Sequence, residues 1–179
     1  MKRAIALTTL LLGTCGAALA QEAICVQNQS WLAISVDQAD HAGQQILVRP
    51  AALGKIKCEF AERPGDYIVN PEGEPLWFDA LVGNYLTTFR STGPDGNIVI
   101  FDIANQTSVV DVPADSDVAA NETSVTYWER TRPGTAKTCP EYAEYTSNGL
   151  GAIIAEERVF DGLSGEITVT GEKRCSATQ

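Results

Sequence analysis

Short runs of alternating apolar and polar residues, separated by turn residues, are the main pattern of this chain. The segment 55–60 shows it most clearly, because Ile56, Cys58 and Phe60 share one face of an extended chain and three charged residues share the other. Other runs rich in apolar and β-branched residues also predict strands, and they cover residues 31–36, 45–49, 67–69, 109–112 and 124–129. A chain of many short strands is expected.

Two segments predict hairpins. Residues 85–90 and 97–102 are β-prone and flank the loop Ser-Thr-Gly-Pro-Asp-Gly at 91–96, which is a strong hairpin signal. Residues 151–160 and 166–170 flank a second turn that contains two glycines. The segment 151–160 could also begin a helix, but its flanking glycines favour a strand.

One short helix is predicted near residues 139–147. Thr138 and Glu141 have the spacing of a capping box, and Asn148-Gly149 supplies a left-handed stop. The fold class is therefore mainly β, a disulfide-stapled β-sandwich or barrel with this one helix. Residues 21–179 are expected to form a single β-rich domain, with the Pro- and Gly-containing segment 70–76 as a loop or as a boundary between two subdomains.

The first twenty residues have the layout of a signal peptide. Lys2 and Arg3 precede an apolar run at 4–12, and the small residues Ala18-Leu19-Ala20 fit a cleavage site. The apolar run is shorter than the roughly 20 residues that a membrane-spanning helix needs. Export to the periplasm or the extracellular space is expected, and lipidation at Cys15 is the alternative, disfavoured because Thr14 precedes that cysteine.

Four cysteines remain beyond the leader, namely Cys25, Cys58, Cys139 and Cys175. An even number in an exported protein indicates disulfides, and no pair has the Cys-x-x-Cys spacing of a redox or metal site. Of the three pairings, we expect Cys25–Cys58 and Cys139–Cys175, each closing a loop worth roughly 3 to 4 kcal/mol. The sequence leaves the other two pairings open.

The charge balance is acidic. The chain has 13 Lys and Arg residues against 23 Asp and Glu residues, a formal net charge of −10, and removal of Lys2 and Arg3 makes it two units more negative. This balance argues against nucleic acid and anionic lipid as partners. Solubility is the simpler explanation of the charge, and attraction to a basic partner is the other.

Few residues could support catalysis. The single histidine, His41, lies in a polar loop, and the residues around Ser164 lack the spacing of a nucleophile elbow, so a His-based triad is not expected. Glu156 and Glu157 would point to opposite faces of a strand, which leaves Asp79 as a lone acidic candidate. No cofactor is expected, because phosphate-binding loops and zinc or copper ligand sets are absent from the sequence.

Calcium is the one metal for which candidate ligands exist. Asp111, Asp115, Asp117 and Glu122 fall within twelve residues, but their spacing departs from the EF-hand loop. We therefore expect a solvated acidic loop rather than a metal site.

Three asparagines, Asn28, Asn105 and Asn121, begin glycosylation sequons. Because the leader resembles a bacterial one, we expect these sequons to arise by chance.

Aromatic residues offer candidate ligand contacts. Trp77 and the pair Tyr142 and Tyr145 could line a binding face, although such residues more often fill a β-sheet core. Trp128 is expected in the core. Taken together, these features predict a non-enzymatic exported module that binds a protein or envelope component, and the acidic charge would favour a basic one. The alternatives are a small Asp/Glu-dependent hydrolase of envelope or secreted polysaccharide and an acidic inhibitor of a basic secreted enzyme.

Overall fold

The computed structural model describes residues 22–70 and 73–179. The expected signal peptide at 1–20 and Cys15 lie outside the described residues. Within the described part of the chain, no helix is long and apolar enough to cross a membrane.

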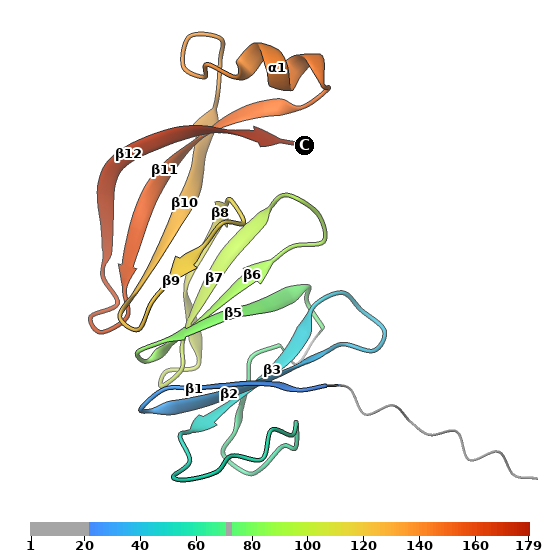
Figure 1. The fold of residues 1–179 in the computed structure, drawn as a ribbon, viewed down its shortest axis with the longest axis vertical. Coiled ribbons are helices and arrows are strands. Elements are labelled where there is room, and N and C mark those ends of the chain that lie inside the picture. Colours follow the sequence, from blue (N-terminus) through green and yellow to red (C-terminus); the bar gives the residue numbers. More distant parts are fainter. Residues whose placement is uncertain (1–21, 71–72) are drawn as a thin grey trace, which may run out of the picture.

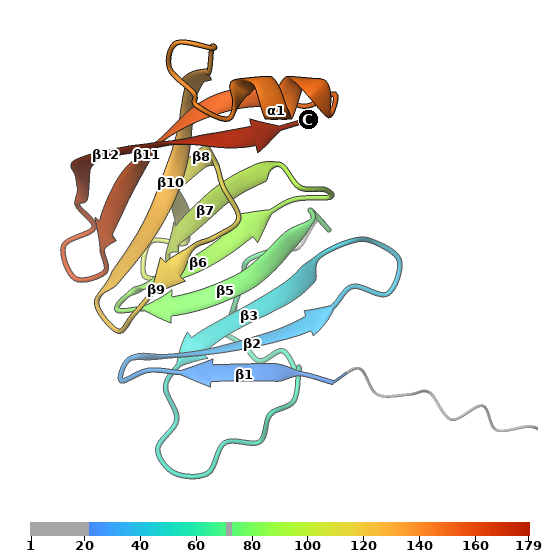
Figure 2. The same cartoon turned by 45° about the horizontal axis from the view of Figure 1, so that its top comes forward.

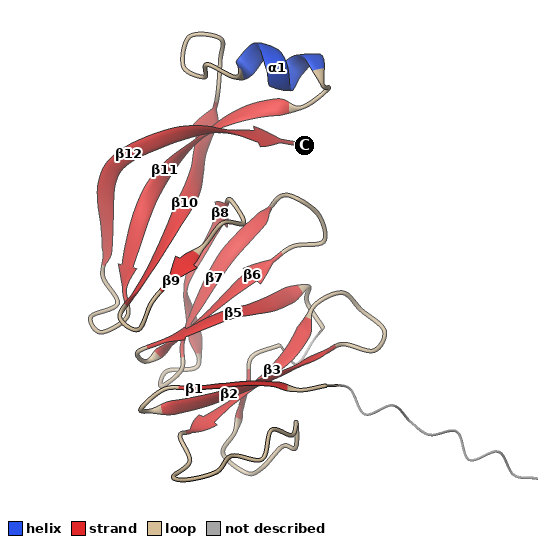
Figure 3. Cartoon of the chain, in the orientation of Figure 1, coloured by secondary structure: helices blue, strands red, loops and turns tan. Residues whose placement is uncertain are grey.

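Two antiparallel sheets and one short helix make up the fold (Figures 1 and 3). The first sheet contains, in spatial order, β1 (Ile24–Gln27), β2 (Trp31–Asp37), β3 (Gln44–Pro50) and β4 (Tyr67–Ile68). The second sheet contains β5 (Leu76–Val82), β6 (Tyr85–Arg90), β7 (Gly96–Asp102), β8 (Thr107–Ala114), β9 (Ala119–Ala120), β10 (Ser124–Pro133), β11 (Gly151–Asp161) and β12 (Ile167–Thr178). The helix α1 (Tyr142–Ser147) lies between β10 and β11 in the chain.

The second sheet curls into a half-barrel. Its strand order is β12-β11-β10-β8-β7-β6-β5, with the short β9 paired to β10. Figures 1 and 2 show this curl, with the first sheet beside β5 and the helix at the far end next to β12. The mainly β class with two disulfides and one short helix is confirmed.

The two sheets share a hydrophobic core. Ala33, Ile46 and Val48 of the first sheet pack in one cluster with residues of the second sheet that include Leu86 and Val99, and all five are buried. A second cluster fills the half-barrel itself, where Tyr127 and Phe160 are its largest fully buried side chains. Of the segment 70–76, singled out in the sequence, residues 71 and 72 lie outside the described residues and Leu76 begins β5.

Both expected hairpins are present. Strands β6 and β7 pair in the register Leu86↔Phe101, so that the apolar alternation places side chains in both clusters. Strands β11 and β12 also pair, with Phe160 opposite Ile167, and a register shift lies between Glu156 and Arg158. The preference for a strand at 151–160 is therefore confirmed.

The prediction of a strand at 55–60 is wrong, because this segment has no regular secondary structure. Ile56 and Phe60 pack against the cluster of Leu32, Ile34 and Leu47 on the outer face of the first sheet. The alternation thus reflects an extended segment pressed against a sheet, without a ladder partner, and Cys58 holds it there through its disulfide.

The prediction of a capping box formed by Thr138 and Glu141 is also wrong. The helix begins at Tyr142, its N-cap is Glu141, and no side chain caps it. The hydroxyl of Thr138 instead accepts a hydrogen bond of 3.0 Å from the backbone N–H of Thr135, which closes a turn before the helix. The expected stop is present, because Gly149 has a φ of +75° directly after the C-cap Asn148.

Trp128 is not in the core, contrary to expectation. Its neighbour Tyr127 is fully buried, and alternation along β10 turns Trp128 to the other face, where it is partly exposed. The guanidinium of Arg174 lies 4.5 Å from the centre of the Trp128 ring, which is within the range of a cation–π contact.

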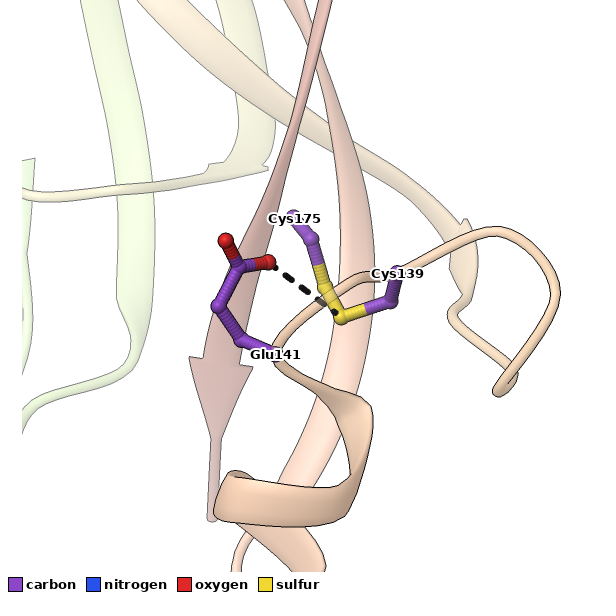
Figure 4. A group of neighbouring side chains, drawn as sticks. All are labelled: Cys139, Glu141 and Cys175. Atoms are coloured by element: carbon purple, nitrogen blue, oxygen red, sulfur yellow. Dashed lines mark hydrogen bonds between the residues drawn. A yellow bond between two sulfur atoms is a disulfide. The ribbon is translucent and has the colours of Figure 1, made fainter.

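Both disulfides have the expected pairing. Cys25–Cys58 joins β1 to the long loop before β4, across 33 positions of sequence. Cys139–Cys175 joins the segment before α1 to β12, across 36 positions (Figure 4). Two disulfides in one chain fit an oxidising compartment.

Candidate functional site

Four hairpin turns meet on one side of the molecule, where Figures 1 and 2 show the turns β1–β2, β5–β6, β9–β10 and β11–β12 on the left. The Asn28 side chain, from the first sheet, donates from Nδ2 to the carbonyl of Gly83 over 2.8 Å. The Gly162 N–H donates to the carbonyl of Thr123 over 2.8 Å. These hydrogen bonds join turns that are far apart in the sequence.

Gly83 is required at this meeting point. Its φ is +56°, and a Cβ added there would lie 2.0 Å from the carbonyl oxygen of Gly162. A side chain would therefore clash with backbone as well as strain the dihedral angle. The close contact of these two glycines brings the β5–β6 turn against the β11–β12 turn.

Asparagines shape two of the four turns. The Asn28 Oδ1 accepts from the N–H groups of Ser30 and Trp31, and the Asn121 Oδ1 accepts from those of Thr123 and Ser124, all over 2.9 Å. These are Asx turns, in which a short side chain replaces a backbone acceptor. The third sequon asparagine, Asn105, lies in the β7–β8 turn, where its Nδ2 donates to the Asp102 carboxylate over 2.8 Å.

The turns enclose a groove of about 740 Å³, which we call the turn groove. Its lining consists of small and apolar residues, uncharged polar residues and two carboxylates, and it comprises Val26, Gln27, Asn28, Gln29, Ser30, Asp79, Ala80, Leu81, Gly83, Asn84, Ala120, Asn121, Glu122, Thr123 and Leu163. None of these lining residues is basic. Leu163, at the rim, is 73% exposed.

Asp79, one of the residues that line the turn groove, occupies a β-bulge. The pairing of β5 with β6 shifts register between Phe78 and Ala80, so Asp79 has no partner across the ladder. Bulges re-aim side chains and are common beside binding sites. Although the residue as a whole is exposed, its neighbours exclude enough water for burial to raise the pKa of the Asp79 carboxyl.

Asp66 and Asp111, by contrast, each have a cation beside them. Asp66 accepts from Arg49 over 2.7 Å, and Asp111 accepts from Arg90 over 2.8 Å. For Asp79, the described residues supply no hydrogen-bond donor and no ion pair. The fold thus leaves a carboxylate unneutralised inside a groove.

A second groove, of about 560 Å³, lies beneath the end of β12. Its centre is Asp115, which is 5% exposed and accepts from Arg130 Nε over 2.7 Å, Arg174 Nε over 2.9 Å and the Ser176 hydroxyl over 2.6 Å. Burial opposes ionisation here, but the hydrogen bonds from Ser176 and the two arginines outweigh it and hold the pKa of Asp115 below its usual value.

Further contacts extend this charge cluster at the end of β12. Arg130 also pairs with Asp95, and Asp95 accepts from the Thr178 hydroxyl over 2.7 Å. Arg174 also pairs with Asp117. Each charged side chain of the cluster thus has an opposite charge beside it. These contacts join β12 to the residues next to β7 and β8, and we call this charge cluster the latch.

The four calcium candidates are placed in different surroundings. Asp115 and Asp117 bind Arg174, and Asp111 binds Arg90 and Asn97. Glu122 lies across the molecule in the turn groove. The acid-rich segment thus serves several arginine contacts rather than forming one cluster of oxygen ligands.

The three aromatic candidates do not come together. Trp77, on β5, is 41% exposed and donates from its indole N–H to the Ser91 carbonyl over 3.0 Å. Tyr142 and Tyr145 pack on Cys139 and Cys175 next to β11, and Tyr145 also lines the second groove. Four strands of the second sheet, β10, β8, β7 and β6, lie between β11 and β5.

One group of three potential metal ligands appears among the described residues, comprising Cys139, Glu141 and Cys175 (Figure 4). The two sulfur atoms form a disulfide, and the Glu141 carboxylate lies 3.9 Å from Cys139 Sγ. Disulfide sulfur is a poor metal ligand, because metals bind the thiolate.

The turn groove was only partly indicated by the sequence. Asp79 is the single acidic residue within the apolar strand 76–82, and the asparagines Asn28 and Asn121 stood out as sequons. Their convergence was hidden, because it depends on how four hairpins dock.

Comparison of the chain with protein-family models, with characterised proteins and with solved structures gives no match. The fold and the groove define a disulfide-stapled, mainly β protein with a groove on one side, lined mostly by hairpin turns.

Proposed function

We propose that this chain is an exported, non-enzymatic binding protein, periplasmic or extracellular, and that the turn groove is its binding surface. The observation that carries the proposal is the unneutralised Asp79 carboxylate within a groove of about 740 Å³. Binding residues commonly lie on loops that a rigid scaffold positions. The size also falls in the roughly 300–1,000 Å³ range of ligand pockets.

The scaffold around the groove supports the same proposal. Two sheets with a shared core, two disulfides and the latch at β12 leave the turns as the adaptable part of the chain. An acidic inhibitor would need free carboxylates on an exposed loop, but Asp111, Asp115 and Asp117 of the acid-rich segment are bound to arginines. An acidic protruding loop is therefore a weaker candidate than the groove.

A blocking variant tests the proposal. Ala120 is exposed and lines the groove, so Ala120→Trp fills it without disturbing the core. Ala143→Trp, on the exposed surface of α1, is the matched control. Each variant and the parent protein serve as bait for the exported fraction of the source cells, after circular dichroism has shown the same fold.

Retention of a component by the parent and by Ala143→Trp, with its loss for Ala120→Trp, is the expected result. Retention of the same component by all three baits would place binding elsewhere on the surface. Retention of nothing by any bait would overturn the proposal.

One observation favours a second candidate, hydrolysis of an envelope or secreted polysaccharide. A carboxyl whose pKa is raised by burial is suited to act as a general acid, and Glu122 in the same groove would be the second carboxylate. Glu156, by contrast, already binds Arg158 and Lys173. Release of reducing sugar from soluble polysaccharides, abolished by Asp79→Asn, is the test of this candidate.

A further inference from the structure

The turn groove differs from the rest of the protein in having no basic residues in its lining. Of the eleven Lys and Arg residues between 22 and 179, eight form ion pairs with the chain's own carboxylates, namely Arg49, Lys57, Arg90, Arg130, Arg132, Arg158, Lys173 and Arg174. None of the eleven lines the groove. The fold therefore uses most of its cations elsewhere and supplies none to Asp79.

Two carboxylates enter the groove from different elements. Asp79 comes from the bulge in β5, and Glu122 comes from the β9–β10 turn. From the β1–β2 turn and from the β11–β12 turn, no titratable side chain lines the groove. A guest in the groove would thus meet negative charge and uncharged polar groups, and no positive charge.

Uncharged polar residues occupy the rest of the wall. Gln29 and Asn84 are exposed there, and Leu163 provides an apolar rim. Side-chain amides and hydroxyls can bond the N–H and C=O groups of an extended peptide, and the apolar rim suits an aliphatic stem. A lysine side chain combines such a stem with a cationic end.

We propose that the turn groove binds a lysine-bearing extended segment of a partner protein, with the ammonium group seated against Asp79. This inference rests on the proposed function, because it names the occupant of the same groove. Opposite charge in a partly enclosed site sets specificity and speeds association. The missing cation of the groove is then supplied by the partner.

The inference also predicts a pH dependence. Protonation of Asp79 removes the charge that the ammonium group needs, and burial raises the pKa of that carboxyl above its usual value. Affinity should therefore fall as the solution is acidified through the pKa of Asp79, with Glu122 as the other titrating group in the groove.

Titration of the disulfide-bonded protein with hexa-L-lysine, followed by backbone amide chemical shifts and by calorimetry, tests the inference. Asp79→Asn keeps the shape of the side chain and removes its charge. Asp40→Asn, in the exposed β2–β3 turn at the other end of β2, makes the same change in net charge outside the groove. An uncharged oligosaccharide, cellohexaose, is the second probe.

Shifts confined to the groove, about tenfold weaker binding for Asp79→Asn and less than about twofold for Asp40→Asn support the inference. Equal weakening in both variants would show non-specific attraction and overturn it. Groove shifts with cellohexaose but none with hexalysine would overturn the lysine ligand and leave the binding function standing. No groove shifts with either probe, together with empty capture experiments, would overturn both.

Discussion

Arg174 donates from Nε to Oδ2 of Asp115 over 2.9 Å and so joins β12 to the end of β8 across 59 positions of sequence. The same arginine lies over the ring of Trp128. The contact shows how the half-barrel holds its last strand, because Asp115 is simultaneously bonded to Arg130. A buried carboxylate between two arginines is thus the central feature of the latch.

Asp115→Asn should destabilise the protein by about 3 kcal/mol, because removal of one partner leaves two arginine side chains without their shared charge. Urea unfolding followed by tryptophan fluorescence measures the change. Asp40→Asn, an exposed carboxylate, should change stability by less than about 0.5 kcal/mol. Equal effects of the two substitutions would mean that the latch contributes no stability.

Acid should weaken the latch. The pKa of Asp115 is lowered in the folded protein from its ordinary value of 3.8, so its stabilising contribution is complete above pH 3.8 and is lost as the pH falls through the lower, folded-state pKa. The parent protein should therefore lose stability more steeply below that value than Asp115→Asn. Melting temperatures measured between pH 2 and 7 give the comparison, and parallel curves would contradict it.

The two disulfides should differ in their resistance to reductant. Cys58 is exposed, whereas Cys139 is 2% exposed, so thiolates reach Cys25–Cys58 more easily. Limited reduction, alkylation and peptide mass spectrometry should find Cys25 and Cys58 labelled first. Preferential labelling of Cys139 and Cys175 would show that the helix end opens more readily than the structure indicates.

Gly83→Ala should destabilise the protein by roughly 3 kcal/mol or more, because the new Cβ meets the carbonyl of Gly162 at a positive φ. Gly54→Ala is the matched control, since Gly54 also has a positive φ, of +88°, but has open space around it. Thermal unfolding of the two variants separates the clash from the dihedral strain. A similar loss for both would assign the effect to the dihedral angle alone.

The sequence predicted what depends on local alternation. The pair of strands at Leu86 and Phe101 and the stop at Gly149 follow from residues that are neighbours along the chain. At 55–60, alternation was equally clear but misleading, because an extended segment packed against a sheet shows the same periodicity as a strand. A ladder partner cannot be recognised from one segment alone.

The turn groove could not be predicted from local sequence patterns, for a related reason. Asp79 becomes a groove residue because of a one-residue bulge, and Glu122 joins it only when two hairpins dock. Trp128 shows the same limit within a strand, since it was expected in the core but its neighbour Tyr127 is the buried residue. Long-range docking and strand phase set these positions.

Hairpin turns supply most of the groove lining around Asp79, so the proposed binding surface lies largely apart from the strands that build the sheets. Residues such as Gln29, Glu122 and Leu163 can be exchanged, or their turns lengthened, while the sheets and cross-links stay as they are. Only the Gly83 contact with Gly162 must be kept. The sheets and cross-links therefore form a frame whose turns can be varied by loop randomisation.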